Sequence, residues 1–356
     1  HILSKKPIIV DSFCAVVRVI DSDKVFILGG NKNLGGPEGD PNLPDTQNAT
    51  TIYNINKKTF IRSQNLNYKR WYASAIITGD EKLILIGGKD VVSNKPSTIP
   101  EFLDLNKPEK GWMLLPEAAS EEFFGNINSQ EEWSYPKSFL ASDGNIVGVS
   151  YNKIWVMDKN NNYKIIKTGE IPLESGGVEG FIEHIDPNNK DKENEKMSAF
   201  VIGSPVGTTS SHVMIDKDKI LVFGGLQEGD GYASSNMVYL IDFSDSFKPK
   251  LTKLNSSKYP RANADTTILP DGNIFINGGT AFGKSDLKFS IFNAEIYNPN
   301  SQTSNELDQA YFRRNYHSTS LLLPDGRILT AGGDVWNAEI FYPPYLFTKD
   351  INNKTI

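Results

Sequence analysis

A glycine pair that closes an apolar strand is the feature of this sequence that most restricts its fold. Such a pair at a strand end lets two backbones approach closely. It recurs five times, as Gly29-Gly30, Gly87-Gly88, Gly224-Gly225, Gly278-Gly279 and Gly332-Gly333. The first glycines are separated by 58, 137, 54 and 54 residues, and the longest interval has room for two degenerate copies. The sequence therefore predicts seven copies of a unit of about 50 residues.

Each copy has the pattern of one antiparallel sheet. In the last copy, strand 316–323 is followed by the turn 324–326, whose Pro-Asp-Gly sequence reverses the chain, and then by strands 327–331 and 338–342. A period of about 50 residues is that of the kelch blade. We therefore predict an all-β chain that folds as a seven-bladed β-propeller with kelch-like repeats. The fourth blade has the weakest pattern and is expected within 165–205.

The two ends of the chain lie outside the repeats. We expect strand 7–11 to pair with the last blade and close the ring, because closure removes an exposed sheet edge. Residues 1–345 would then form the propeller. Segment 346–356 leaves the repeat and is interpreted as an exit toward a further, C-terminal domain.

Composition excludes several classes of protein. With 37 basic and 43 acidic residues the net charge is −6, which argues against nucleic acid or an anionic membrane as the partner. No apolar run is long enough to span a membrane as a helix. The first residues, from His1 to Lys6, lack the apolar core of a signal peptide. A single cysteine, Cys14, excludes an internal disulfide framework.

One position of the repeat collects residues with metal and redox chemistry. The position lies 15 residues before the first glycine of each pair, and inner strands of a propeller meet near its axis. It holds Cys14, Tyr72, Tyr135 (counted from Ser150), Asn263 and His317, with Tyr316 beside the histidine. We therefore expect Cys14, Tyr72, Tyr316 and His317 to converge at one mouth of the axis.

This set suits a copper site. Imidazole and phenolate are ligands for Cu(II) in tetragonal geometry. A cysteine beside a phenol can form a thioether, which makes the phenol easier to oxidise to a radical. Copper and a ligand radical together accept two electrons. Taken singly, the residues have plainer interpretations, with Cys14 as a small buried residue, Tyr72 as a packing aromatic and His317 as a hydrogen-bonded polar residue.

The whole chain resembles the copper radical oxidases, the galactose oxidase and glyoxal oxidase family. The residues that carry the resemblance are Phe13-Cys14, Arg70-Trp71-Tyr72, Tyr316-His317-Ser318, the Leu-Leu-Leu-Pro-Asp-Gly-Arg run at 321–327 and the Ala-Glu-Ile-Phe-Tyr-Pro-Pro-Tyr run at 338–345. The resemblance implies a Cys14–Tyr72 thioether cofactor and copper bound by Tyr72, Tyr316 and His317. It also implies that Tyr316 takes the proton of an alcohol, in a secreted or cell-surface enzyme that oxidises a primary alcohol or aldehyde and reduces O₂ to H₂O₂.

The sequence departs from that family in ways that leave a second hypothesis open. The family's second copper histidine comes from an immunoglobulin-like domain after the propeller, and the other histidines of this chain, His1, His184 and His212, do not match its motif. Lys89 follows Gly88 where galactose oxidase has its stacking tryptophan, and the galactose-binding arginine has no match. The alternative is a non-catalytic kelch propeller that binds a protein or a glycan.

Overall fold

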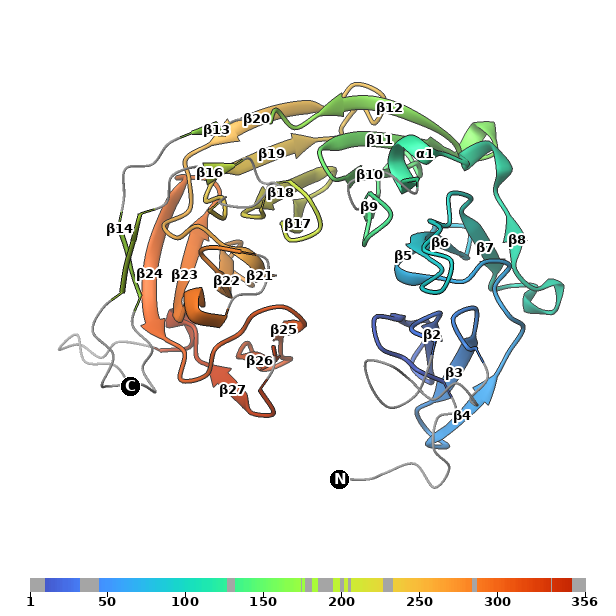
Figure 1. The fold of residues 1–356 in the computed structure, drawn as a ribbon, viewed down its shortest axis with the longest axis horizontal. Helices are drawn as coiled ribbons and strands as arrows, with labels where there is room; N and C mark the ends of the chain where they lie inside the picture. Colours follow the sequence, from blue (N-terminus) through green and yellow to red (C-terminus); the bar gives the residue numbers. More distant parts are fainter. Residues whose placement is uncertain are drawn as a thin grey trace. The chain divides into compact units, whose positions relative to one another are not determined.

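The computed structural model describes residues 10–32, 45–126, 132–173, 175–176, 181–184, 195–198, 202–203, 206–226, 233–283, 287–333 and 335–347. These residues form two compact units. The first is His1–Glu170 with Asp245–Lys248, and the second is Ile171–Ser244 with Pro249–Ile356. Nearly all regular structure in both units is β-strand (Figure 1), as the sequence predicted.

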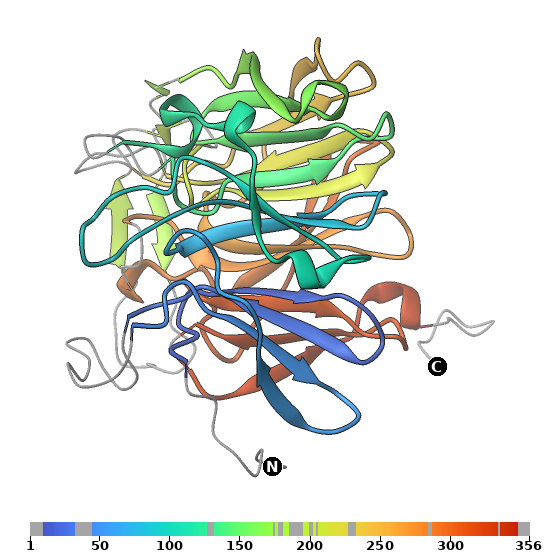
Figure 2. The same ribbon diagram turned by 90° about the vertical axis from the view of Figure 1, so that its right-hand side faces the viewer.

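The first unit contains three antiparallel four-stranded sheets, ordered β1-β2-β3-β4, β5-β6-β7-β8 and β12-β11-β10-β9. Figure 2 shows the strands of the first sheet side by side. The elements are β1 (Val16–Val19), β2 (Lys24–Leu28), β3 (Thr50–Asn54), β4 (Thr59–Arg62), β5 (Trp71–Ile77), β6 (Lys82–Lys89), β7 (Glu101–Asp104), η1 (Pro108–Lys110), β8 (Met113–Leu114), η2 (Pro116–Ala118), α1 (Glu121–Phe124), β9 (Lys137–Leu140), β10 (Ile146–Ser150), β11 (Lys153–Asp158), η3 (Lys159–Asn161) and β12 (Lys164–Glu170).

The second unit repeats the same blade, with sheets β17-β18-β19-β20, β21-β22-β23-β24 and β25-β26-β27. Two small ladders, β13-β16 and β14-β15, precede them. The elements are β13 (Ser175–Gly176), β14 (Phe181–His184), β15 (Glu195–Ser198), β16 (Ile202–Gly203), β17 (Ser211–Asp216), β18 (Lys219–Phe223), β19 (Val238–Asp242), β20 (Lys250–Leu254), β21 (Ala262–Ile268), β22 (Ile274–Thr280), η4 (Leu287–Phe289), β23 (Asn293–Asn298), β24 (Thr303–Gln309), β25 (Ser318–Leu322), β26 (Ile328–Gly332), β27 (Ala338–Phe341) and η5 (Pro344–Leu346).

The hydrophobic core lies between consecutive blades within each unit. Leu28 of β2 and Leu85 of β6 belong to one buried cluster, which joins the first two blades. Ile84 of β6 and Trp155 of β11 belong to the next. The strands β6, β18 and β22, each the second strand of its blade, bury side chains on both faces, because a neighbouring blade covers each face. This explains the near-continuous apolar runs that precede the glycine pairs.

The prediction of seven blades was wrong for the residues that the structure describes, which form six. Part of the segment expected to be blade four is β12, the outer strand of the third blade. Among its described residues the rest contributes two short ladders, and its glycine pair, Gly176-Gly177, does not follow a long apolar run. Residues 1–9 lie outside the described part, so closure by strand 7–11 stays a prediction. The Asp11 carbonyl accepts a hydrogen bond from the Asn31 amide of the first blade at 3.1 Å.

Candidate functional site

The residues singled out by counting share one unusual backbone conformation. All five have positive φ, namely Cys14 (57°), Tyr72 (63°), Tyr135 (45°), Asn263 (57°) and His317 (64°). Bulky residues avoid this left-handed region, which costs about 1–2 kcal/mol for an L-residue. Such conformations persist where the surrounding structure enforces them, often at functional sites. The common register inferred from the sequence therefore corresponds to a common backbone geometry.

Backbone hydrogen bonds join these positions from blade to blade within the first unit. The Tyr72 amide donates to the Cys14 carbonyl at 3.2 Å, and the Tyr135 amide donates to the Tyr72 carbonyl at 2.8 Å. In the second unit the Asn263 amide donates to the Thr209 carbonyl at 2.9 Å. The backbones of Cys14, Tyr72 and Tyr135 are thus linked in series within the first unit.

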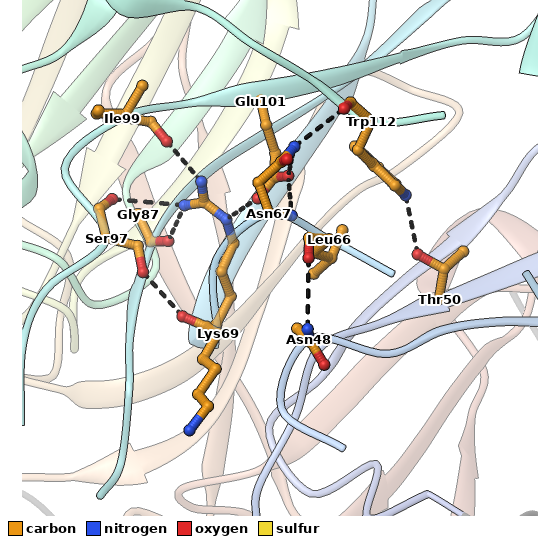
Figure 3. A network of polar contacts seen from close by, with 11 residues as sticks. Asn48, Thr50, Leu66, Asn67, Lys69, Gly87, Ser97, Ile99, Glu101 and Trp112 are labelled. Carbon is orange, nitrogen blue, oxygen red and sulfur yellow. Dashed lines mark hydrogen bonds and ion pairs between the residues drawn. The ribbon is translucent and has the colours of Figure 1, made fainter. Parts of the chain in front are cut away.

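A buried arginine anchors the segment that carries Tyr72. Arg70 is fully buried, and its Nε donates to Glu101 Oε1 at 2.8 Å (Figure 3). Its other nitrogens donate to the carbonyls of Gly87 and Ile99, each at 2.6 Å. The Arg70 carbonyl accepts the Gly30 amide of the preceding blade at 2.9 Å. One side chain therefore ties the start of β5 to its own blade, while its backbone ties it to the neighbouring blade.

The same arrangement, an arginine whose side chain contacts a glutamate and a glycine carbonyl of its own blade, recurs in two other blades. We call it the arginine latch; it was not predicted from the sequence. Arg261 contacts Glu295 and the Gly278 carbonyl, and Arg314 contacts Glu339 and the Gly332 carbonyl. The signal was available, because Arg70 and Arg261 each precede the first glycine of their pair by 17 residues. The number of residues between the glycine pair and the glutamate differs from blade to blade, so the spacing did not reveal the arginine–glutamate pairs.

Aromatic side chains surround Tyr72. Its ring lies 3.9 Å from that of Trp71 and 4.7 Å from that of Tyr135, measured between centroids. Trp133 stacks against Trp71 at 6.1 Å with an interplanar angle of 21°. The Lys89 ammonium lies 4.1 Å from the Trp133 ring centroid, a favourable cation–aromatic contact. Trp71, which the sequence analysis named only as part of the Arg70-Trp71-Tyr72 motif, thus contacts Tyr72 directly.

The thiol of Cys14 is half-buried and free of any disulfide. Its side chain is hydrogen-bonded to Tyr135. Burial, together with the neighbouring Cys14, raises the pKa of Tyr135 well above its usual value. Tyr135 is therefore a neutral phenol that can donate a hydrogen bond to sulfur.

Tyr316 and His317 form the second predicted pair, in the second unit. Their rings stack, with centroids 3.7 Å apart and planes at 28°. Asn315 fixes the backbone here, since its Oδ1 accepts the Tyr316 amide and its carbonyl accepts the Ser318 amide, both at 2.8 Å. His317 is exposed and Tyr316 is half-buried, so the imidazole is accessible to a ligand.

A buried carboxylate supports the same segment. Ser318 Oγ donates to Asp265 Oδ2 of the preceding blade at 2.7 Å. Burial raises the pKa of Asp265 to about 6, against the lowering effects of Ser318 and Arg314. This contact connects β21 with the first residue of β25, directly after His317.

The structure describes the Cys14–Tyr72 pair and the Tyr316–His317 pair in different units. No group of three or more His, Cys, Asp or Glu side chains suited to a metal ion occurs among the described residues. Any metal site built from the predicted residues would therefore depend on phenol oxygens. None of the helices in the described part is both long and apolar enough to cross a membrane.

No protein-family model matches the chain. The chain is 24% identical over 360 residues to a galactose oxidase of Gibberella zeae, in an alignment that covers 97% of this chain and 47% of the relative. It is 27% identical over 306 residues to aldehyde oxidase GLOX1 of Arabidopsis thaliana, which covers 78% and 45% respectively. The chain therefore spans about half the length of these curated relatives.

Among solved structures, the fold is similar to that of a fungal alcohol oxidase of the AA5 family determined in complex with copper. The TM-score is 0.70 at 19% sequence identity, and the match covers 95% of this chain and 64% of the other. This likeness supports the propeller fold along almost the full chain. The two sequence relatives confirm the resemblance predicted from the motifs: over most of its length the chain is similar to a galactose oxidase and to an aldehyde oxidase.

Proposed function

We propose that this chain is the propeller part of a copper radical oxidase. The enzyme would oxidise a primary alcohol or aldehyde, free or on a glycan, and reduce O₂ to H₂O₂. The observation that carries the proposal is the backbone hydrogen bond between Tyr72 and Cys14, the only cysteine of the sequence, both held in strained backbone conformations at neighbouring blades. The names of the sequence relatives and the copper complex of the structural neighbour support it.

The donors in the predicted set fit copper chemically. Tyr72, Tyr316 and His317 would hold the ion, since phenolate and imidazole are suitable Cu(II) ligands. The accessible imidazole of His317 and the stacked ring of Tyr316 support this assignment. Bound copper would supply one of the two electron-accepting centres that a two-electron oxidation needs.

Cys14, Tyr72 and Tyr316 would carry out the other steps, which are the formation of the cross-link and the transfer of hydrogen from the substrate. Cross-linking forms one bond from the Cys14 sulfur to a ring carbon of Tyr72 and breaks one S–H and one C–H bond. The two hydrogens pass to O₂ as H₂O₂. In turnover, Tyr316 would accept the hydroxyl proton of the substrate, and the oxidised Tyr72 would accept a hydrogen atom from its carbon.

We further propose that the second copper histidine comes from sequence beyond these 356 residues, in a C-terminal immunoglobulin-like domain. The galactose oxidase relative is longer than this chain, which covers 47% of it. We also propose that the protein is secreted, because a copper-dependent source of H₂O₂ is suited to an oxidising compartment.

One observation favours the alternative function, a propeller that binds a protein or glycan without catalysis. Lys89 and Asn94 form a polar edge beside the half-buried Trp71, with Lys89 Nζ donating to Asn94 Oδ1 at 2.7 Å. Aromatic rings beside hydrogen-bonding groups suit a binding surface for a polar ligand. Such a surface would need neither copper nor a thioether.

The two functions are separated by a peroxide assay on the copper-loaded protein, with small primary alcohols and aldehydes as substrates. We expect H₂O₂ from the parent protein, and a loss of at least a hundredfold in Tyr316→Phe, since general-base catalysis contributes about 10²–10⁴-fold. Tyr311→Phe is the matched control, because this exposed tyrosine lies near the motif without a proposed role. Stoichiometric copper without any peroxide would contradict the oxidase proposal.

A further inference from the structure

Two tyrosines are neighbours of Cys14, and the sequence assigned a role to only one of them. Tyr72 and Tyr135 occupy the same register as Cys14 in the next two blades, and backbone hydrogen bonds link the three in series. The rings of the two tyrosines meet edge to face, with centroids 4.7 Å apart and planes at 73°. The Cys14 sulfur therefore has two tyrosine neighbours, and the arrangement of the side chains determines which of the two rings it bonds to.

Tyr135 is held in place from several sides. Its amide donates to the Tyr72 carbonyl, its ring contacts the Tyr72 ring, and its hydroxyl reaches the Cys14 side chain. The next residue, Pro136, packs against Gly87, where an added Cβ would lie 2.7 Å from the proline ring. The Tyr135 ring is thus fixed by its neighbours, and its hydroxyl interacts with the Cys14 side chain.

We propose that Tyr135 is a positioning residue whose hydroxyl holds the Cys14 sulfur in place for bond formation with the ring of Tyr72. This inference rests on the proposed function for its cross-linking step. A hydrogen bond to sulfur removes rotamers that point the thiol away, so the reacting atoms spend more time within reach. The step itself forms the C–S bond and transfers two hydrogens to O₂, so Tyr135 is neither consumed nor oxidised.

Tyr135→Phe removes only the hydroxyl and keeps the ring contact with Tyr72. The first measurement is the rate at which the intact chain loses two hydrogens after addition of Cu(II) in air, followed by mass spectrometry. One ordinary hydrogen bond corresponds to about a fivefold effect, so we expect cross-linking to be about fivefold slower. Peptide mapping identifies the bonded tyrosine, and we expect it to be Tyr72 in the parent protein.

Tyr163→Phe is the matched control. Tyr163 belongs to the same blade, and its hydroxyl interacts with Thr78 and Lys82 instead of Cys14. The two variants each lose one tyrosine hydroxyl, so a general destabilisation would slow both. We expect the cross-linking rate of Tyr163→Phe to equal that of the parent protein.

A second measurement needs neither copper nor activity. Because Cys14 is the only cysteine, the S–H stretching band in the Raman spectrum of the copper-free protein reports this thiol alone. We expect the band to shift and broaden in Tyr135→Phe and to stay unchanged in Tyr163→Phe. A superimposable band and an equal rate in Tyr135→Phe would overturn the inference, as would a cross-link to Tyr135 itself.

The two measurements separate this inference from the proposed function. Failure of the parent protein to cross-link at full copper loading would refute the thioether cofactor. The Raman comparison would then decide alone whether Tyr135 holds the thiol.

Discussion

Lys137→Met is expected to stabilise the protein. Lys137 is the first residue of β9, and burial alone lowers the pKa of its ammonium group from 10.5 to about 8. That difference corresponds to a cost of about 3 kcal/mol for keeping the amine charged in the folded state. Because the side chain keeps part of its surface exposed, solvent screening reduces the cost, and we take about 2 kcal/mol. Methionine keeps the unbranched stem and removes the charge.

The effect of Lys137→Met on the melting temperature should depend on pH, because the penalty exists only while the buried amine is charged. The folded pKa lies below the unfolded value, so the penalty is complete below pH 8 and fades as the pH rises toward 10.5. We therefore expect the melting temperature of Lys137→Met to exceed that of the parent by about 5 °C at pH 7, from about 2–4 °C per kcal/mol in a unit of this size. The difference in melting temperature between Lys137→Met and the parent should be smaller at pH 9.5.

The control is Lys164→Met, which changes an exposed lysine on β12 of the same blade. We expect its melting temperature to follow that of the parent at both pH values. A lower melting temperature for Lys137→Met at pH 7, or a gap that widens as the pH rises, would refute the reasoning from burial.

Three further predictions concern the blades. Arg70→Ala leaves the buried Glu101 carboxylate unpaired and should cost about 3–5 kcal/mol, seen as a lower melting temperature; an unchanged melting temperature would contradict the latch. Gly87→Ala places a Cβ 2.7 Å from backbone and proline atoms at a φ of +68° and should reduce soluble yield, whereas Gly79→Ala meets no described atom within 4 Å and should not. In the parent protein, stability should fall as the pH rises from about 4 through 6, because the folded pKa of Asp265 is raised to about 6. This fall should be absent from Asp265→Asn. A melting temperature of the variant that falls over the same pH range as that of the parent would contradict the assignment.

The repeat and the register could be predicted from the sequence, because both follow from spacing along the chain. Each glycine pair ends an inner strand, and counting back from it found Cys14, Tyr72 and His317 in one conformation. The extent of each blade was harder to predict. β12 lacks a glycine pair, so its residues were assigned to a separate fourth blade.

The partners of individual side chains, within a blade or between blades, could not be predicted from the sequence. Glu101 and Glu295 follow their glycine pairs by different numbers of residues, so nothing in the spacing shows that each pairs with an arginine. The contact of Tyr135 with Cys14 spans three blades and depends on rotamers. The sequence placed Tyr135 in the register, and only the structure shows which side chain it reaches.

The central claim is that Cys14 and Tyr72 form one redox-active unit. The most direct test is the mass of the intact chain after incubation with Cu(II) and air, followed by digestion and peptide mapping. We predict a loss of two hydrogens that maps to a peptide joining Cys14 to Tyr72. A free Cys14 thiol at full copper loading would contradict the claim.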